Sequence, residues 1–401
     1  MDRAAAAGMT EGAETRKAGL GQGLMVVLAG FLPILAIVAL SPAVPRIAQH
    51  FAEVPNAGTL IPLIVTAPGL MIALFSPVMG WLADRYGRRL LLVISTLIYG
   101  AVGIAPLFFD SLPEIFASRL ALGLCEAAIL TVTNTLLGDY FDHDRRRTWL
   151  TLQGLVGPIF GTSVVAISGF LTARTWNASF LIYAVAFPIF LATLVTIYEP
   201  PAQARSAPAQ GAQTPFPWLH VAIFSAVTLF ASTIYYVYIV QVGLAFSRVG
   251  VTQPDRIGLL ISLASIGVFL GAALFQWLSG RCNSAQQILV FLTLLGAGLV
   301  GIGFSPDAST MTGFAFVQQL GAGISIPALV LWAISRTPAE HRGRGMGCWT
   351  AAFFLGQFTS PLFFSGAKLL SGDLQRTFAY LGGIALLGAL VALRPAFAAR
   401  R

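Results

Sequence analysis

The sequence is poor in charged residues, which make up only 10% of its 401 positions. Soluble globular domains average about 25% charged residues. Hydrophobic residues account for 56%, and the mean hydropathy is +0.79. A water-soluble protein of this composition would expose apolar surface on every side. The composition therefore indicates a protein whose solvent is the lipid bilayer.

Cysteine and histidine are scarce as well. The three cysteines, Cys125, Cys282 and Cys348, lie far apart in the chain, which argues against a disulfide framework or a zinc site. The four histidines are scattered near the ends of apolar runs, so we expect no histidine-ligated metal or haem. The sequence has no P-loop and no Ser–His–Asp grouping. We therefore expect no cofactor, no metal and no enzymatic activity, and ATP is not expected as an energy source.

Long apolar runs dominate what is present. A helix needs about 20 apolar residues to cross a bilayer. Twelve segments qualify, at 22–44, 58–80, 90–109, 113–137, 148–171, 178–198, 217–243, 257–278, 285–305, 309–333, 345–367 and 376–393. The sequence therefore predicts an all-α membrane protein with twelve transmembrane helices.

The twelve predicted spans form two sets of six. We expect one six-helix bundle over 21–198 and a second over 217–393. Between them, residues 199–216 read EPPAQARSAPAQGAQTPF, a composition typical of a flexible linker. Residues 1–20 are predicted to be a polar tail rather than a signal peptide, and 394–401 a short C-terminal tail.

The formal net charge of +8 does not indicate nucleic-acid binding, because the basic residues sit in short clusters between apolar runs. Most of the arginines and lysines fall in alternate loops, on the same side as both tails. By the positive-inside rule, this bias places both termini in the cytoplasm. We expect a multi-pass protein of the plasma membrane, which in a bacterium is the inner membrane.

The stretch GWLADRYGRR separates the second and third predicted spans and combines glycines, an acid and three arginines. Its residues of interest are Gly80, Asp84, Arg85, Gly87, Arg88 and Arg89. Topology and turn formation alone would explain the arginines and glycines. They do not explain Asp84, whose charge opposes the positive-inside bias.

This stretch resembles the signature loop of the major facilitator superfamily, G-x-x-x-D-R-x-G-R-R/K, which falls between the same two spans. The resemblance implies the major facilitator fold, two six-helix bundles that alternate access to a central cavity. In that family the loop clasps the bundles together on the cytoplasmic side, as a gate. It implies that Asp84 lies at the N-terminal end of the eleventh span, where the helix dipole is positive. It also implies that Arg85 pairs with Asp139, at the inner end of the fourth span.

The fourth span contains two ionisable residues, Arg119 and Glu126. Charges inside a membrane are costly, which makes such residues candidates for function. A separation of seven residues places both on one helix face, about 10.5 Å apart along the axis. Arg119 and Gly123 resemble the R-x-x-x-G motif of proton-coupled members of the superfamily. Glu126 could gain and lose a proton with Arg119 tuning its affinity, or the two could form a buried ion pair that orders the bundle.

The fifth span contains GLVGPIFG, with Gly154, Gly157, Pro158 and Gly161. Proline bends a helix, and glycine permits close contact with a neighbouring helix. The spacing resembles the antiporter signature of the drug–proton export branch. That signature usually has one more glycine, where this chain has Thr162. The resemblance favours export over import.

In this family the first, fourth, seventh and tenth spans line the central cavity. The resemblance assigns to it Glu126 and Asn134 from the fourth span, Tyr235, Tyr236 and Gln241 from the seventh, and Gln318 and Gln319 from the tenth. The tyrosines could instead be anchors at the membrane interface. A cavity with mainly apolar and aromatic walls suits a lipophilic or amphiphilic organic molecule.

We therefore expect a secondary transporter that exports small organic compounds by alternating access, coupled to protons. Its partners would be the substrate, protons and the bilayer, and we expect a monomer. The alternative with the same fold is an importer or facilitator of an organic acid or other small nutrient, with Arg119 as the carboxylate anchor. A membrane enzyme or receptor is the third alternative, for which the sequence carries no motif.

Overall fold

The computed structural model describes residues 18–200 and 215–398. Most of the predicted N-terminal tail and most of the predicted linker therefore lie outside the described residues. The predicted boundary at 393 is too early, because residues 394–398, which were assigned to the C-terminal tail, continue the last helix. Within these ranges the regular elements are all helices, which confirms the all-α prediction. They are α1 (Leu20–Gly30), α2 (Leu32–Val38), α3 (Val44–His50), α4 (Ala57–Tyr86), α5 (Arg88–Ile104), η1 (Ala105–Phe108), α6 (Leu112–Tyr140), α7 (His143–Thr172), η2 (Ala178–Val185), α8 (Ala186–Thr196), α9 (Trp218–Arg248), α10 (Pro254–Ser279), α11 (Ser284–Phe304), α12 (Ala308–Ser335), η3 (Ala339–His341), α13 (Arg342–Ser371) and α14 (Leu374–Ala398).

Eleven segments of the described chain are helical, long and apolar enough to cross a membrane, and each coincides with a predicted span. The remaining predicted span is α13, a 30-residue helix with polar residues such as Gln357 and Ser360 in its middle. Both side chains are fully buried, so the polar groups face protein rather than lipid. Together these helices form the twelve-span fold that the sequence predicts.

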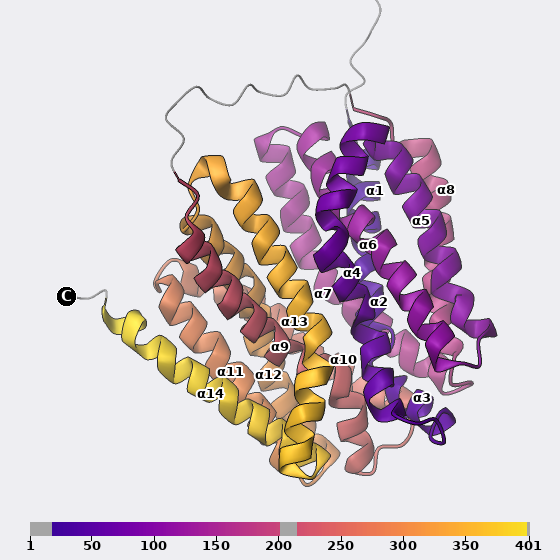
Figure 1. Cartoon of the computed structure of the whole chain (residues 1–401), viewed down its shortest axis with the longest axis vertical. Coiled ribbons are helices and arrows are strands. Elements are labelled where there is room, and N and C mark those ends of the chain that lie inside the picture. The colour runs from indigo at the N-terminus through magenta and orange to yellow at the C-terminus, as the bar shows by residue number, and fades with distance from the viewer. Residues whose placement is uncertain (1–17, 201–214, 399–401) are drawn as a thin grey trace, which may run out of the picture.

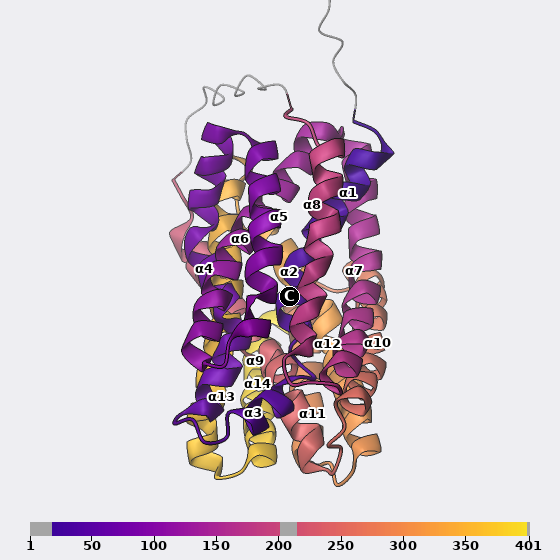
Figure 2. The same cartoon turned by 90° about the vertical axis from the view of Figure 1, so that its right-hand side faces the viewer.

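The helices form two bundles that stand side by side. In Figure 1 the indigo-to-magenta helices α1–α8 make one bundle, and the orange-to-yellow helices toward α14 belong to the other. Figure 2 shows the first bundle in front, with its helices running along the long axis. We call the end where α8 finishes and α9 starts the linker end, and the opposite end, where α3 lies, the far end.

The first predicted span is not a continuous helix. α1 stops at Gly30, and α2 begins at Leu32 after a bend at Phe31. Pro33 lacks the N–H that would bond to the carbonyl four residues earlier, so the helix cannot run through unbroken. The N–H of Phe31 reaches the carbonyl of Leu28 instead, at 3.1 Å. This bend shapes the wall of the cavity described below.

The two bundles touch closely at the far end. Ser41 donates its hydroxyl hydrogen to the carbonyl of Ile239 across the interface, with 2.7 Å between the oxygens. A Cβ atom on Gly169 of α7 would lie only 3.0 Å from the Cα of Gly258 on α10, so the helices cross there almost backbone to backbone. These contacts close the far end of the interface between the bundles.

Candidate functional site

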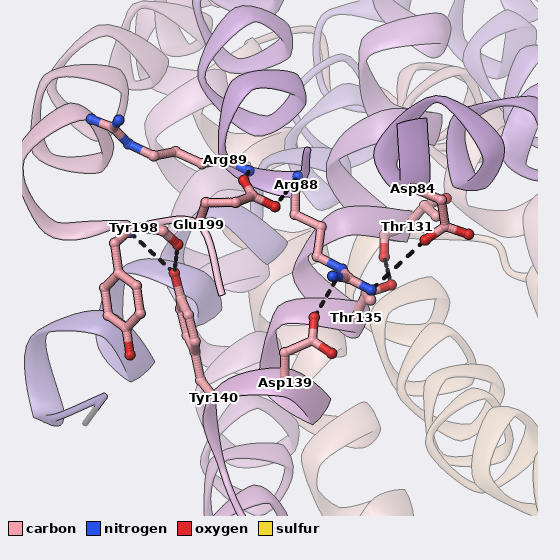
Figure 3. Close-up of polar contacts among 9 residues, drawn as sticks. All are labelled: Asp84, Arg88, Arg89, Thr131, Thr135, Asp139, Tyr140, Tyr198 and Glu199. Carbon is pink, nitrogen blue, oxygen red and sulfur yellow. Dashed lines mark hydrogen bonds and ion pairs between the residues drawn. The ribbon is translucent and has the colours of Figure 1, made fainter. Parts of the chain in front are cut away.

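The turn between α4 and α5 is a single residue, Gly87, with φ +96°. This conformation is strained for any residue with a Cβ, which explains glycine here. The side chain of Glu199, just after α8, fits against the turn. Its two carboxylate oxygens accept hydrogen bonds from the backbone N–H groups of Arg88 and Arg89, both at 2.8 Å (Figure 3). An anion is favourable at this position, because the free N–H groups at a helix start carry partial positive charge.

The side chain of Arg88 lies between two acids on neighbouring helices (Figure 3). Its Nε atom is 2.9 Å from Oδ2 of Asp139 on α6, and its Nη2 atom is 3.7 Å from Oδ1 of Asp84 on α4. Asp139 is only 14% exposed, whereas Asp84 is 55% exposed. The ion pairs therefore join α4, α5 and α6 inside one bundle.

The predicted pairing of Arg85 with Asp139 is wrong, because Arg88 occupies that position. α4 stays helical through Tyr86, six residues beyond the predicted end of the span. Arg85 consequently lies on the exposed face of α4, where its guanidinium is 5.5 Å from the ring centre of Trp81 and 5.8 Å from that of Tyr86. Arg88 comes after the Gly87 turn and faces α6.

Glu199 is a residue that sequence reasoning missed, since it was read as the start of the linker. It belongs to a set of contacts that holds the end of the first bundle. The hydroxyl of Tyr140 hydrogen-bonds to the backbone carbonyl of Tyr198 and accepts from its N–H. Arg89 donates to the carbonyl of Leu194 at 2.9 Å. The sequence signal is an acid directly after the sixth apolar span, and its partner is the basic loop between the second and third spans.

Arg119 on α6 is fully buried and binds backbone oxygens rather than an acid. Its Nη2 atom donates to the carbonyl of Gly103 at 3.1 Å, near the C-terminal end of α5. Its guanidinium carbon is 5.1 Å from the ring centre of Phe180 and 4.8 Å from that of Tyr183, both on η2. A cation is favourable at a helix C-terminus and over aromatic faces. Arg119 thus joins α5, α6 and η2.

Glu126 is also fully buried, and neither carboxyl oxygen has a hydrogen-bond partner among the described residues. Arg119 interacts with it electrostatically, but the two side chains form no ion pair within 4.0 Å. A buried polar atom without a partner is costly, so this carboxyl needs a functional explanation.

A cavity of about 410 Å³ lies between the bundles, with walls from α1, α2, α6, α7, α9, α10, α12 and α13. Most lining residues are apolar or aromatic, and none of those among the described residues carries a formal charge. The polar lining residues are Ser41, Gln153, Thr162, Tyr235, Tyr236, Tyr238, Ser265 and Gln319. Such a cavity suits an apolar molecule with a few hydrogen-bonding groups.

The structure brings some of the predicted cavity residues to this cavity and not others. Tyr235, Tyr236 and Gln319 line it. Gln241 and Gln318 are buried but do not line it, and Asn134 is exposed elsewhere on α6. Glu126 does not line it either, but Leu130, one turn further along α6, does. Gln153 and Ser41 are lining residues that sequence reasoning missed, because single polar residues in an apolar span carry no motif.

The glycines and proline of the GLVGPIFG stretch, Gly154, Gly157, Pro158 and Gly161, all line this cavity. Pro158 lies inside the unbroken helix α7. A Cβ atom on Gly154 would meet nothing within 4 Å, and one on Gly157 would be 3.5 Å from Phe31. These positions therefore leave room in the cavity. Their role in bending α7 stays a prediction.

Comparison with known proteins matches nearly the whole chain. The sequence profile of the Major Facilitator Superfamily matches residues 26–253 and 221–399. The class C tetracycline resistance protein of Escherichia coli is 25% identical in an alignment that covers 92% of this chain and 96% of that protein. The 4-hydroxybenzoate transporter PcaK of Pseudomonas aeruginosa is 26% identical, with 69% of this chain and 73% of the transporter covered.

The fold is also similar to that of solved structures. A crystal structure of a D-xylose–proton symporter superposes with a TM-score of 0.75. The match covers 93% of this chain and 97% of the symporter, at 16% sequence identity. At this identity the likeness concerns the fold.

Proposed function

Because this chain belongs to the major facilitator superfamily, a family of transporters and not of enzymes, we propose that it exports small lipophilic or amphiphilic organic compounds in exchange for protons. The observation that carries the proposal is the unpartnered carboxyl of Glu126 beside an uncharged cavity between the bundles. A substrate with few polar groups fits such walls without leaving protein charges unpaired.

Glu126 is the proton carrier in this proposal. It lies one helical turn before Leu130 on α6, and Leu130 lines the cavity between the bundles. When the bundles move relative to each other, the walls of this cavity move as well. The environment of the carboxyl then changes with the state of the transporter, and protonation and substrate binding are coupled.

The proposed orientation places both termini and the linker end in the cytoplasm of a bacterial cell. The far-end contacts at Ser41 and Gly169 would then close the outer side, and the structure would correspond to an inward-facing state. Closure of the linker end over the Asp84–Arg88–Asp139 cluster would give the outward-facing state. We propose that the transporter works as a monomer, since the cavity lies within one chain.

The direction of transport rests on two supports. The GLVGPIFG stretch of α7 resembles the signature of drug–proton antiporters, and the similar Escherichia coli protein is named for resistance to a drug. Import of an organic acid is the second candidate, favoured by the similarity to a 4-hydroxybenzoate transporter. The geometry gives this candidate no cationic anchor, because Arg119 is fully buried against Gly103 and two aromatic rings.

Proteoliposomes with an imposed pH gradient test the proposal. We expect the wild-type protein to move a lipophilic fluorescent dye against the proton flow, with proton entry reported by an internal pH dye. Glu126→Gln should abolish both fluxes. Glu114→Gln is the matched control, since Glu114 lies on the same helix but is exposed.

Two results would contradict the proposal. Proton-driven flux at the wild-type rate in Glu126→Gln would remove Glu126 as the carrier. Uptake of 4-hydroxybenzoate together with protons, without any dye export, would establish the second candidate instead.

A further inference from the structure

A second cavity, of about 1000 Å³, lies between α7 of the first bundle and α10 and α12 of the second. The two helices α7 and α10 cross closely at Gly169 and Gly258 near the far end. Closer to the middle they are still joined, because Ser262 donates to the carbonyl of Thr162 at 3.1 Å. Beyond that point they diverge toward the linker end. We call the space between them the α7–α10 wedge.

Exposed apolar side chains line part of the wedge. Leu150 and Leu155 on α7 and Phe269 on α10 are 44%, 52% and 43% exposed. Both α7 and α10 are long and apolar enough to cross a membrane. Exposed apolar side chains on such helices are suited to contact with hydrocarbon. On the other edge of the interface, α4 is packed against α13 at Gly69, where a Cβ atom would be 3.0 Å from the carbonyl of Phe354.

The wedge leads into the central cavity. Gly154 and Pro158 of α7, Val268 of α10 and Ile326 of α12 line both spaces. The missing side chain of Gly154 leaves the passage open, since a Cβ atom there would meet nothing within 4 Å. The two spaces therefore share a wall and adjoin each other.

The charges along this path are all at one end. Arg146 and Arg147, in the first turns of α7, line the mouth of the wedge at the linker end. No acidic residue among the described residues lines either space. Arg147 and Gly161 are 14 residues apart on one helix, which corresponds to roughly 21 Å. That distance is about two-thirds of the hydrocarbon thickness of a bilayer.

From this arrangement we infer that the wedge is a lateral portal for single-chain amphiphiles with an anionic head group, such as long-chain fatty acids, taken from the linker-side leaflet. The head group binds at Arg146 and Arg147, and the alkyl chain extends past Gly154 into the uncharged cavity. Arginine suits this role because its guanidinium pairs with carboxylates and phosphates at a membrane interface. The inference rests on the proposed function and names the substrate class of the same cavity.

Photolabelling tests the portal directly. A palmitate analogue with a diazirine at the chain end is added to the full-length protein in phosphatidylcholine nanodiscs, and labelled peptides are mapped by mass spectrometry. We expect labelling of α7 between Gly154 and Gly161 and of α10 around Val268. Excess palmitate should compete, whereas butyrate and hexadecyltrimethylammonium should not.

Variants separate the contributions of charge and space. Replacing both arginines, Arg146→Gln with Arg147→Gln, should lower labelling about fivefold, as expected for two partly exposed ion pairs. Arg145→Gln is the matched control on the same turn, since Arg145 does not line the wedge. Leu155→Trp should block the passage with the charges intact, and Leu152→Trp is its control for size.

The outcomes distinguish this inference from the proposed function. Unchanged labelling in the double arginine and Leu155→Trp variants, or equal competition by the cationic amphiphile, overturns the portal even if proton-driven dye export is normal. Labelling as expected, without proton-driven flux and without an effect of Glu126→Gln on transport, supports the portal and overturns proton exchange. Glu126→Gln should leave the labelling itself unchanged, because Glu126 lines neither space.

Discussion

The Nε atom of Arg88 lies 2.9 Å from Oδ2 of Asp139, so the first residue of α5 is tied to the end of α6. Both side chains are largely buried, at 22% and 14% exposure. Removing one partner of such a pair leaves the other charge poorly solvated, which costs more than the pair itself contributes. We therefore predict that replacing Arg88 lowers the stability of the protein more than replacing Arg85 does.

We expect Arg88→Gln to destabilise the protein by roughly 1–3 kcal/mol, because Asp139 loses its cation. Arg85→Gln should change stability little, since Arg85 contacts only the rings of Trp81 and Tyr86 on the exposed face of α4. Thermal unfolding of the two variants in detergent measures the difference. Equal losses for both would mean that the charge of the loop matters and the pairing does not.

Asp84→Asn should reduce transport while membrane insertion and thermal stability stay close to wild type. The side chain is 55% exposed, and its 3.7 Å contact with Arg88 is long, so it adds little to the stability of this state. We expect its main effect in the state with a closed linker end. Initial transport rates in proteoliposomes, normalised to the amount of inserted protein, check this. A normal rate would remove Asp84 from the gate.

The Gly87 turn predicts two losses of stability. Gly87→Ala should cost about 1–3 kcal/mol, because φ +96° is strained for alanine and its Cβ would be 2.9 Å from Glu199. Glu199→Gln should cost about 0.3–1 kcal/mol, because the start of α5 loses its anionic cap. Glu53→Gln, an exposed acid at the far end, is the control. The melting temperature of each variant in detergent measures the loss. If Gly87→Ala and Glu199→Gln melted at the same temperature as wild type and the Glu53→Gln control, the turn would have no role in stability.

A large side chain at Gly169 should open the far end. A Cβ atom there would be 2.6 Å from the carbonyl of Pro254, so Gly169→Leu cannot keep the crossing with α10. We expect a cysteine placed at Ser41, in a background without the native cysteines, to react several-fold faster with a membrane-impermeant maleimide. Gly366→Leu is the control, since a Cβ atom there meets nothing within 4 Å. No change in reactivity would mean that this crossing does not hold the far end shut.

Acid should weaken the start of α14. Hydrogen bonds from the backbone N–H groups of Arg376 and Gln375 lower the pKa of Asp373, in the turn before that helix. A lowered pKa stabilises the folded state above the unfolded pKa of about 3.9, and this contribution is lost as the pH falls through the lower folded value. Asp373→Asn should therefore lower the melting temperature at pH 7, and the gap to wild type should shrink below pH 4. A gap independent of pH would contradict this account.

Much of the fold follows from the sequence. Apolar runs of membrane length mark the spans, because a chain that crosses lipid must satisfy its backbone hydrogen bonds within a helix. The basic residues in alternate loops then predict which ends of the spans lie on the same side of the membrane. The ends were less predictable. α4 continues past Gly80 to Tyr86, since polar side chains at a membrane surface do not stop a helix. Because of this extension, Arg85 lies on the exposed face of α4, and the prediction that it pairs with Asp139 is wrong.

The site was predictable where a motif marked it. Arg88 belongs to the GWLADRYGRR motif, and its partner Asp139 lies on α6. The glycines of the GLVGPIFG stretch of α7 line the cavity. Gln153, Ser41 and Glu199 were not found. Each acts through contacts with segments far away in the chain, and one polar residue at the edge of an apolar run does not reveal them.

Both edges of the interface between the bundles are closely packed. α4 meets α13 at Gly69 and Phe354, and α7 meets α10 at Gly169 and Gly258. The bundles are thus joined along both edges rather than hinged along one. An antibody fragment whose epitope lies within one bundle would bind every state of the transport cycle, whereas one that grips both bundles at the linker end would hold the protein in a single state and stop turnover.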